Sequence, residues 1–166
     1  MNKLSAMIER YVAPMANKLA RQKYVQAIQS TFLTMIPFLT VGSFALILIS
    51  PAMDFHEMDP GIMRTFMEGW QWFADFAYGP LNAINYATMS CLALYLAFGM
   101  GFFLSKHHGM KGYLPTVLCG ISFIVVNAIA PDGSFTTDYL GGTGLFGSMI
   151  TAGIAFELYR FLYDHK

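Results

Sequence analysis

The stretch TFLTMIPFLTVGSFALILI, Thr31–Ile49, contains no charged residue and is apolar over most of its length. It lies inside a longer uncharged run, because 30 residues without Asp, Glu, Lys or Arg separate Lys23 from Asp54. A transmembrane helix needs about 20 mostly apolar residues. The stretch therefore predicts a helix that crosses a membrane.

Three further uncharged runs of 30, 20 and 18 residues follow along the chain. Each run contains a strongly apolar stretch that is close to the length of a membrane span. We expect these spans at residues 88–104, 114–130 and 145–163. The predicted fold is therefore an all-α polytopic membrane protein with about four transmembrane helices.

The composition excludes several other classes of protein. Of the 166 residues, 55% are hydrophobic and 12% are charged, with a formal net charge of zero. Soluble domains carry about 25% charged residues, and a nucleic-acid-binding domain is basic. The segments 92–104 and 120–130 are apolar all round, whereas soluble helices have a polar face, and no segment alternates like a barrel strand. The partner that this composition implies is the lipid bilayer, not nucleic acid.

The charges differ in sign between alternate segments. The segment before the first span, the loop between the second and third spans and the C-terminal segment hold nine Lys/Arg and three acidic residues. The other two loops hold one Arg and seven acidic residues. Basic residues collect in cytoplasmic loops. We therefore expect a multi-pass protein of the cell membrane with both termini in the cytoplasm.

The first 26 residues have the spacing of an amphipathic helix. Apolar residues recur every three or four positions, and the basic residues lie largely between them. Such a helix is typical of a membrane surface, and a docking surface for a cytoplasmic partner is the alternative. The segment has no small-x-small cleavage site after a short apolar core, so we expect an uncleaved anchor rather than a signal peptide.

The first external loop predicts a short interfacial helix. One face carries Ile62, Phe66 and Phe73, and the opposite face carries polar residues such as Arg64 and Glu68. Trp70 and Trp72 also fall here, and tryptophan is enriched at membrane interfaces. Aromatic rings beside carboxylates could instead bind a sugar, and we weigh that alternative below the interfacial one.

The first and fourth spans contain residues that favour bending or close packing. Pro37 removes a backbone donor from the first span, and Gly42-Ser43 follows one turn later. Nearby Ser and Thr hydroxyls are available to satisfy the freed carbonyl. The fourth span has a small-xxx-small pair, Ser148 and Ala152. This spacing favours internal packing first and dimerisation second.

Three polar residues of the third and fourth spans are candidate functional residues. Asn127 is an amide in an apolar span, where it more often joins helices than binds a ligand. Glu157 lies inside the fourth span, with Arg160 three residues on. An ion pair within the helix is the first interpretation, and proton or substrate handling is the second.

The sequence contains no pattern for catalysis, metal binding or a cofactor. His107-His108 lies in a short basic loop without a neighbouring acid along the chain. Cys91 and Cys119 lie in predicted spans, where a thiol is desolvated. The glycines of 141–147 lack the Lys-Ser/Thr of a nucleotide-binding loop.

Several segments resemble one permease family. They are the run from Pro14 to Ala20, then Gln22–Ser30, Phe32, Met35-Ile36-Pro37, Gly42-Ser43-Phe44 and Pro51, the basic loop 106–111, and Phe156–Tyr159. The family is the lactose/cellobiose-type membrane subunit IIC of the bacterial phosphoenolpyruvate-dependent sugar phosphotransferase system.

The resemblance implies a homodimeric inner-membrane permease for a β-linked disaccharide such as cellobiose or lactose, with phosphorylation by cytoplasmic IIB and IIA components. It also implies that residues 1–26 form the cytoplasmic amphipathic helix. Residues 27–166 would be the N-terminal scaffold and dimerisation part. Family members are more than twice as long, so the sugar-binding half is expected to lie outside this sequence, and no sugar-binding residue is assigned.

Two other functions are compatible with the sequence. The chain could be a small membrane scaffold that oligomerises and docks a cytoplasmic protein. It would use the small-residue face of the fourth span, which includes Ser148 and Ala152, and the basic N-terminal helix. A pore-forming oligomer ranks last, because no span carries a continuous polar stripe.

Overall fold

The computed structural model describes residues 21–50, 61–110, 113–130 and 132–165. These residues form five α-helices, and the regions between them contain a single 3-10 turn and an isolated bridge between Ile129 and Phe135. The helices are α3 (Lys23–Ile49), α4 (Ile62–Thr88), α5 (Leu92–His107), α6 (Leu114–Asn127) and α7 (Leu145–Asp164), with the 3-10 turn η2 at Gly142–Gly144. The all-α prediction is confirmed. Most of the predicted N-terminal amphipathic helix lies outside the described residues.

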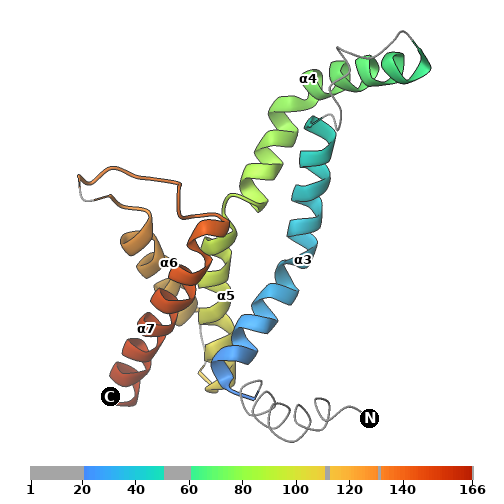
Figure 1. Ribbon diagram of the computed structural model, residues 1–166. Helices are drawn as coiled ribbons and strands as arrows, with labels where there is room; N and C mark the ends of the chain where they lie inside the picture. Colours follow the sequence, from blue (N-terminus) through green and yellow to red (C-terminus); the bar gives the residue numbers. More distant parts are fainter. Residues whose placement is uncertain (1–20, 51–60, 111–112, 131, 166) are drawn as a thin grey trace, which may run out of the picture.

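Helix α5 is the centre of the arrangement, because it packs against α3, α6 and α7 (Figure 1). Its residues Leu96 and Leu104 are completely buried, as are Phe123 of α6 and Phe156 of α7. Helix α4 packs along α3 and extends beyond the other helices. The chain therefore forms two groups of helices, the α3–α4 pair and the α5–α6–α7 bundle, which meet along α3 and α5.

Small residues let the helices of the bundle approach closely. A Cβ on Gly101 would lie 2.8 Å from both Pro115 O and Thr116 Cα, which are backbone atoms of α6. Ser148 and Ala152 of α7 are fully buried, and Cys119 Sγ donates a hydrogen bond to Ala152 O at 3.4 Å. The small-residue face of α7 is thus used in internal packing, as its first interpretation held.

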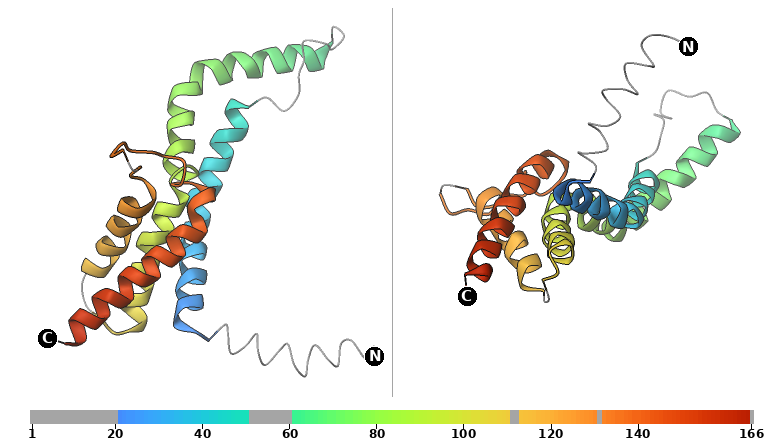
Figure 2. Two further views of the ribbon diagram at one scale, coloured as in Figure 1. Left: turned by 60° about the vertical axis from the view of Figure 1, so that its left-hand side comes forward. Right: turned by 90° about the horizontal axis from the view of Figure 1, so that it is seen from below.

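Helix α4 corrects the prediction of a short external helix. The predicted segment is the first half of a 27-residue helix that continues to Thr88 without a break. Figure 2 shows this half lying across the end of the molecule before the helix turns to run beside α3. Pro80 lies inside α4 after Gly79, and a proline within a helix bends it. The second predicted span therefore consists of the end of α4 together with α5.

The helices differ in their ability to cross a membrane. Lys23–Ile49 and Gly142–Asp164 are each long and apolar enough, and α4 with α5 passes the same test as a pair bent by 41°. Helix α6 has only 14 residues, because the chain turns at Ala128 toward the bridge at Ile129. Two or three candidate spans are present by length and composition, so the count of four stays a prediction.

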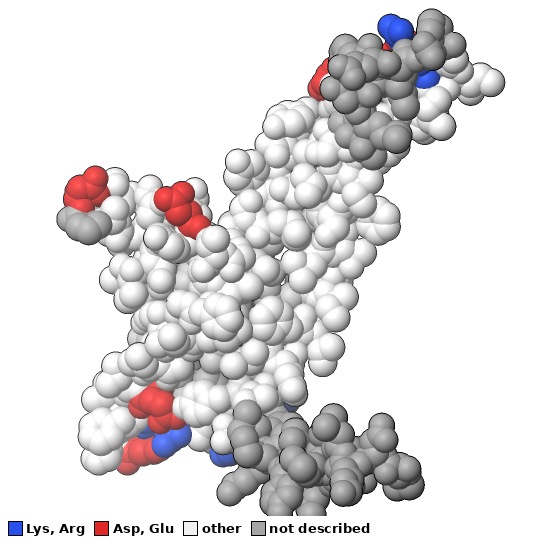
Figure 3. Space-filling model, in the orientation of Figure 1, with Lys and Arg blue, Asp and Glu red and all other residues white. Residues whose placement is uncertain are grey.

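Charged side chains lie at the two ends of the described helices, with an uncharged band between them (Figure 3). Lys23, Lys106 and Arg160 belong to one end, where α3 begins and where α5 and α7 end. Asp132 and Asp138 follow α6 at the other end. This distribution is typical of helices whose middle parts lie in hydrocarbon.

Candidate functional site at the basic end of the helices

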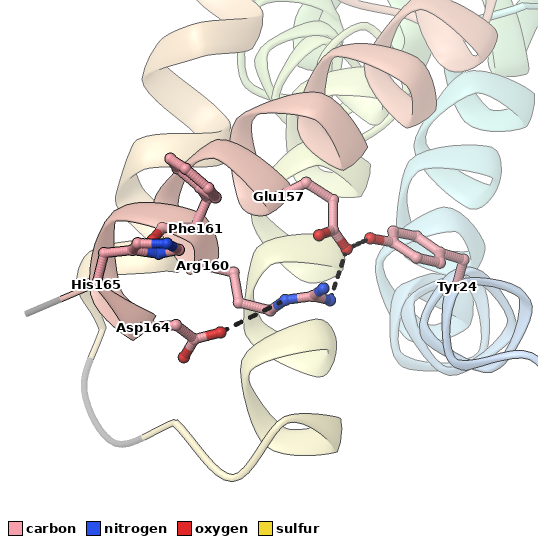
Figure 4. A network of polar contacts seen from close by, with 6 residues as sticks. All are labelled: Tyr24, Glu157, Arg160, Phe161, Asp164 and His165. Carbon is pink, nitrogen blue, oxygen red and sulfur yellow. Dashed lines mark hydrogen bonds and ion pairs between the residues drawn. The ribbon is translucent and has the colours of Figure 1, made fainter.

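A group of polar side chains gathers where α3 begins and α7 ends (Figure 4). Tyr24 is the second residue of α3. Glu157, Arg160 and Asp164 are three and four residues apart in the last turns of α7, and this spacing places them on one side of the helix. We call these four residues the Tyr24–Asp164 cluster.

The carboxylate of Glu157 is shared by two donors. Arg160 Nη1 lies 2.9 Å from Glu157 Oε1, and the hydroxyl of Tyr24 donates to the same oxygen. Arg160 Nε lies 3.9 Å from Asp164 Oδ2. The ion pair expected from the spacing of Glu157 and Arg160 is therefore present. The bond from Tyr24 adds a link between α3 and α7, which the spacing of Glu157 and Arg160 did not predict.

His108 lies beside the cluster, directly after α5. Its ring centroid is 5.5 Å from that of Phe156. Partial burial lowers the pKa of His108 below its usual value, and the positive charges of Lys23 and Arg160 lower it further. The opposing effect of Asp164 is smaller. The neutral imidazole is therefore favoured at neutral pH.

The geometry of the Tyr24–Asp164 cluster favours a role in holding helices in place over a role in catalysis. The Glu157 carboxylate is engaged by a phenol and a guanidinium, and neither donor is a general base near neutral pH. Among the described residues, no three His, Cys, Asp or Glu side chains are grouped so that they could hold a metal ion. What the cluster can do is to hold the ends of α3 and α7 together and to present a mixed charge at the basic end.

Pro37 lies within α3, where the hydroxyls proposed to satisfy the freed carbonyl have other partners. Thr31 donates to Ala27 O at 2.7 Å, Thr34 to Ser30 O at 2.8 Å and Thr40 to Ile36 O at 2.9 Å. Each hydroxyl thus bonds the preceding turn of its own helix rather than the carbonyl that Pro37 leaves free, which is that of Leu33.

Gly42 and Ser43 lie at the contact between α3 and α4. A Cβ on Gly42 would overlap the side-chain hydroxyl of Thr88, so any larger residue would require Thr88 to shift. The carbonyl of Gly42 accepts a hydrogen bond of 3.3 Å from Asn85 Nδ2. Ser43 donates to Leu39 O at 2.8 Å. This pair of residues is therefore placed for helix packing, at the opposite end of α3 from Tyr24.

Asn127 joins α6 to α7. Its Nδ2 donates to Phe123 O at 3.2 Å and to Thr151 Oγ1 at 3.4 Å. A Cβ on Gly147 would lie 2.9 Å from Asn127 Oδ1, so the amide packs directly over that glycine. These contacts favour the interpretation of Asn127 as a link between helices. Of the candidate residues taken from the sequence, only Glu157 and Arg160 have side chains that contact one another.

The aromatic residues Phe66, Trp70 and Phe73 of the first half of α4 line a common pocket, but no acidic residue of the described ranges lines it. Trp70 Nε1 donates to Leu48 O at 3.0 Å, close to the end of α3. The acidic residues pair along their own helix, since Arg64 Nε lies 3.0 Å from Glu68 Oε1 and Gln71 Nε2 donates to Asp75 Oδ1 at 2.9 Å. This arrangement favours the interfacial interpretation over the sugar-binding one.

Sequence reasoning missed the three tertiary hydrogen bonds made by Tyr24, Asn85 and Trp70. Each joins residues between 22 and 133 positions apart, and no local spacing predicts such pairs. One signal was available for Tyr24. A tyrosine at the edge of an apolar span usually finds a partner for its hydroxyl.

Comparison with known proteins identifies a matching family. Residues 29–166 match the family described as "Phosphotransferase system, EIIC". The lichenan permease IIC component of Bacillus subtilis (strain 168) is 28% identical over 180 residues, which cover 100% of this chain and 38% of that protein. The cellobiose-specific EIIC component of Geobacillus stearothermophilus is 26% identical, over 96% of this chain and 36% of its own.

A solved structure matches the fold. It is the crystal structure of the transporter ChbC, the IIC component from the N,N'-diacetylchitobiose-specific phosphotransferase system. The TM-score is 0.73 at 26% sequence identity, and the match covers 96% of this chain and 38% of that chain. The chain thus spans well under half the length of these relatives.

Proposed function

The chain belongs to the EIIC family of the phosphotransferase system, and we propose that it acts as the N-terminal, scaffold part of a sugar permease. The observation that carries this proposal is the family match over residues 29–166, together with the structural likeness to a transporter at a TM-score of 0.73. Transport would require the sequence that corresponds to the remainder of the relatives. Under this proposal the Tyr24–Asp164 cluster fixes the scaffold at its basic end.

The relatives suggest the class of substrate. Their names refer to lichenan, oligo-β-mannosides, cellobiose and lactose, which are β-linked saccharides. We propose import of a β-linked disaccharide such as cellobiose or lactose. Phosphorylation would be carried out by cytoplasmic IIB and IIA components, and the permease would work as a homodimer. The candidate residues of this chain would then serve the scaffold rather than the sugar.

The proposed topology has both termini in the cytoplasm and several passes through the cell membrane. The basic residues Lys23, Lys106 and Arg160 at one end and the acidic loop of Asp132 and Asp138 at the other support this orientation, since basic residues favour the cytoplasmic side. The scaffold without transport activity has less support, because the small-residue face of α7 is buried inside the chain.

Uptake tests the proposal. Membrane vesicles containing the 166-residue chain, co-expressed with the C-terminal remainder of the lichenan permease IIC component, are supplied with phosphoenolpyruvate and the soluble phosphotransferase components. We expect accumulation of labelled cellobiose phosphate with both parts and none with either part alone. Equal absence of uptake in all three preparations, with both parts present in the membrane, would contradict the proposal.

A further inference from the structure

A cavity of about 370 Å³ opens between α3, α5 and α6. Its apolar wall includes Met35 and Phe38 of α3 and Phe98 and Phe102 of α5. Phe38 and Phe102 are 57% and 54% exposed, so the cavity opens sideways, toward the surroundings of the helices. It is more than twice the volume of the cavity of about 150 Å³ that holds a benzene ring in another protein.

One polar atom in the wall of this cavity lacks a partner. Thr116 Oγ1 is buried and makes no hydrogen bond within the part of the chain that the structure describes. Thr116 also lines the cavity. A buried hydroxyl without a partner is costly, and a ligand with an acceptor group at this position would satisfy it.

A cationic side chain, that of Lys106, lies beyond the cavity toward the basic end of the helices. Lys106 is four residues after Phe102, so it lies one turn further along the same side of α5. It is exposed and makes no ion pair with a described residue. Thr116 of α6 lies beside Gly101 of α5, because a Cβ on Gly101 would lie 2.8 Å from Thr116 Cα. Lys106 is five residues beyond Gly101, or about 7.5 Å at 1.5 Å per residue.

We propose that this cavity binds one acyl chain of an anionic phospholipid. The chain occupies the apolar space, Thr116 Oγ1 donates to an ester carbonyl, and the phosphate lies against Lys106. An acyl chain, an ester and a phosphate follow one another in a phospholipid in the same order as the apolar wall, the hydroxyl and the cation. The inference depends only on the membrane location of the helices, so it is independent of transport.

Retention of lipid by the purified protein tests the proposal. The 166-residue chain is reconstituted in bilayers of phosphatidylcholine and phosphatidylglycerol, transferred to mild detergent and weighed by native mass spectrometry. We expect one phosphatidylglycerol per chain, in preference to phosphatidylcholine. A chain that carries no phosphatidylglycerol, whether it is a monomer or a dimer, would overturn the proposal.

A matched pair of variants shows whether the lipid lies in this cavity. Thr34 and Thr40 are both exposed on α3, and each hydroxyl bonds the preceding turn, but only Thr34 lines the cavity. Thr34→Trp fills the space and is expected to abolish retention, whereas Thr40→Trp leaves it unchanged. Equal retention by both variants would place the lipid elsewhere.

Two further variants test the polar contacts. Lys106→Gln is expected to lower retention of phosphatidylglycerol about fivefold, which is the effect of one lysine at an anionic surface, and Lys106→Arg to restore it. Thr116→Val is expected to lower retention about fivefold through loss of one hydrogen bond. If Thr116→Val instead raises the melting temperature without changing retention, the hydroxyl has no lipid partner and the proposal fails.

Discussion

The α5–α6–α7 bundle and the α3–α4 pair are both apolar, but they are held together differently. In the bundle, Leu96, Phe123 and Phe156 are completely buried and backbones approach at Gly101. In the pair, the buried side chains are small or unbranched, such as Ala45 of α3 and Met67 and Ala74 of α4. The pair is linked by hydrogen bonds from Asn85 to Gly42 O at 3.3 Å and from Trp70 to Leu48 O at 3.0 Å. The bundle also has two such bonds, from Cys119 to Ala152 O and from Asn127 to Thr151 Oγ1, and both are longer, at 3.4 Å.

The way in which these helices associate follows from their hydrocarbon surroundings. In hydrocarbon, apolar side chains gain little by leaving the lipid, so helices associate through close packing or through hydrogen bonds. The bundle buries large side chains between its helices, whereas the pair combines a close approach at Gly42 with the two hydrogen bonds. Both regions leave large apolar side chains, such as Leu33 of the pair and Phe146 of the bundle, exposed to lipid or to other protein segments.

The largest effect is expected from Gly101→Ala in the bundle. The added Cβ would lie 2.8 Å from backbone atoms of α6, which cannot move without shifting that helix. We expect a loss of about 1–3 kcal/mol, as for other overpacked sites. The measurement is thermal unfolding in detergent, with Gly69→Ala as the matched control, because nothing lies within 4 Å of a Cβ there. If both variants melt alike, close packing does not distinguish the two regions.

A smaller effect is expected from Asn85→Ala in the pair. The variant removes the bond to Gly42 O, and a hydrogen bond between transmembrane helices contributes about 0.6 kcal/mol on average and at most about 1.7 kcal/mol. Asn127→Ala in the bundle should cost less, since its amide also bonds a carbonyl of its own helix and its bond to Thr151 is longer. The melting temperatures of the two variants give the comparison, and a larger loss for Asn127→Ala would reverse it.

The smallest effect concerns pH at the basic end. The pKa of His108 is lowered in the folded protein, first by burial and then by Lys23 and Arg160. As the pH falls, His108 therefore binds a proton at a higher pH in the unfolded chain than in the folded protein. The folded state loses stability below about pH 6.5 for this reason. Melting curves at pH 7.5 and 5.5 should show a smaller drop in His108→Gln than in the unsubstituted protein. His165→Gln is the control, and equal drops would show that His108 does not titrate as expected.

The sequence predicted the helices well where charge and hydropathy alone determine them. Helices α3 and α7 lie where uncharged runs predicted spans, and Glu157 pairs with Arg160 as their spacing indicated. The boundaries around α4 were wrong. The charged first turns resemble an external loop, but no residue ends the helix before Thr88, and Pro80 bends it without breaking it.

The contacts between distant helices could not be predicted from one sequence. Tyr24 and Glu157 meet because α3 and α7 converge at one end, and this convergence depends on the packing of both helices against α5. The cavity beside Thr116 likewise results from three helices that meet at an angle. A hydropathy pattern contains neither the angle nor the side on which the helices meet.

The unequal lengths of the helices affect the surrounding bilayer. Helix α6 is about 21 Å long at 1.5 Å per residue, while α3, with 27 residues, is about 40 Å long. Ile121 and Val126 of α6 are exposed to the surroundings, so lipid chains next to them meet a short apolar wall. With α6 as the predicted third span, a hydrocarbon layer of about 30 Å would become thinner beside it, while α3 would tilt to fit the same layer. The protein is therefore expected to deform the bilayer asymmetrically, with the lipid thinner on the α6 side than on the α3 side.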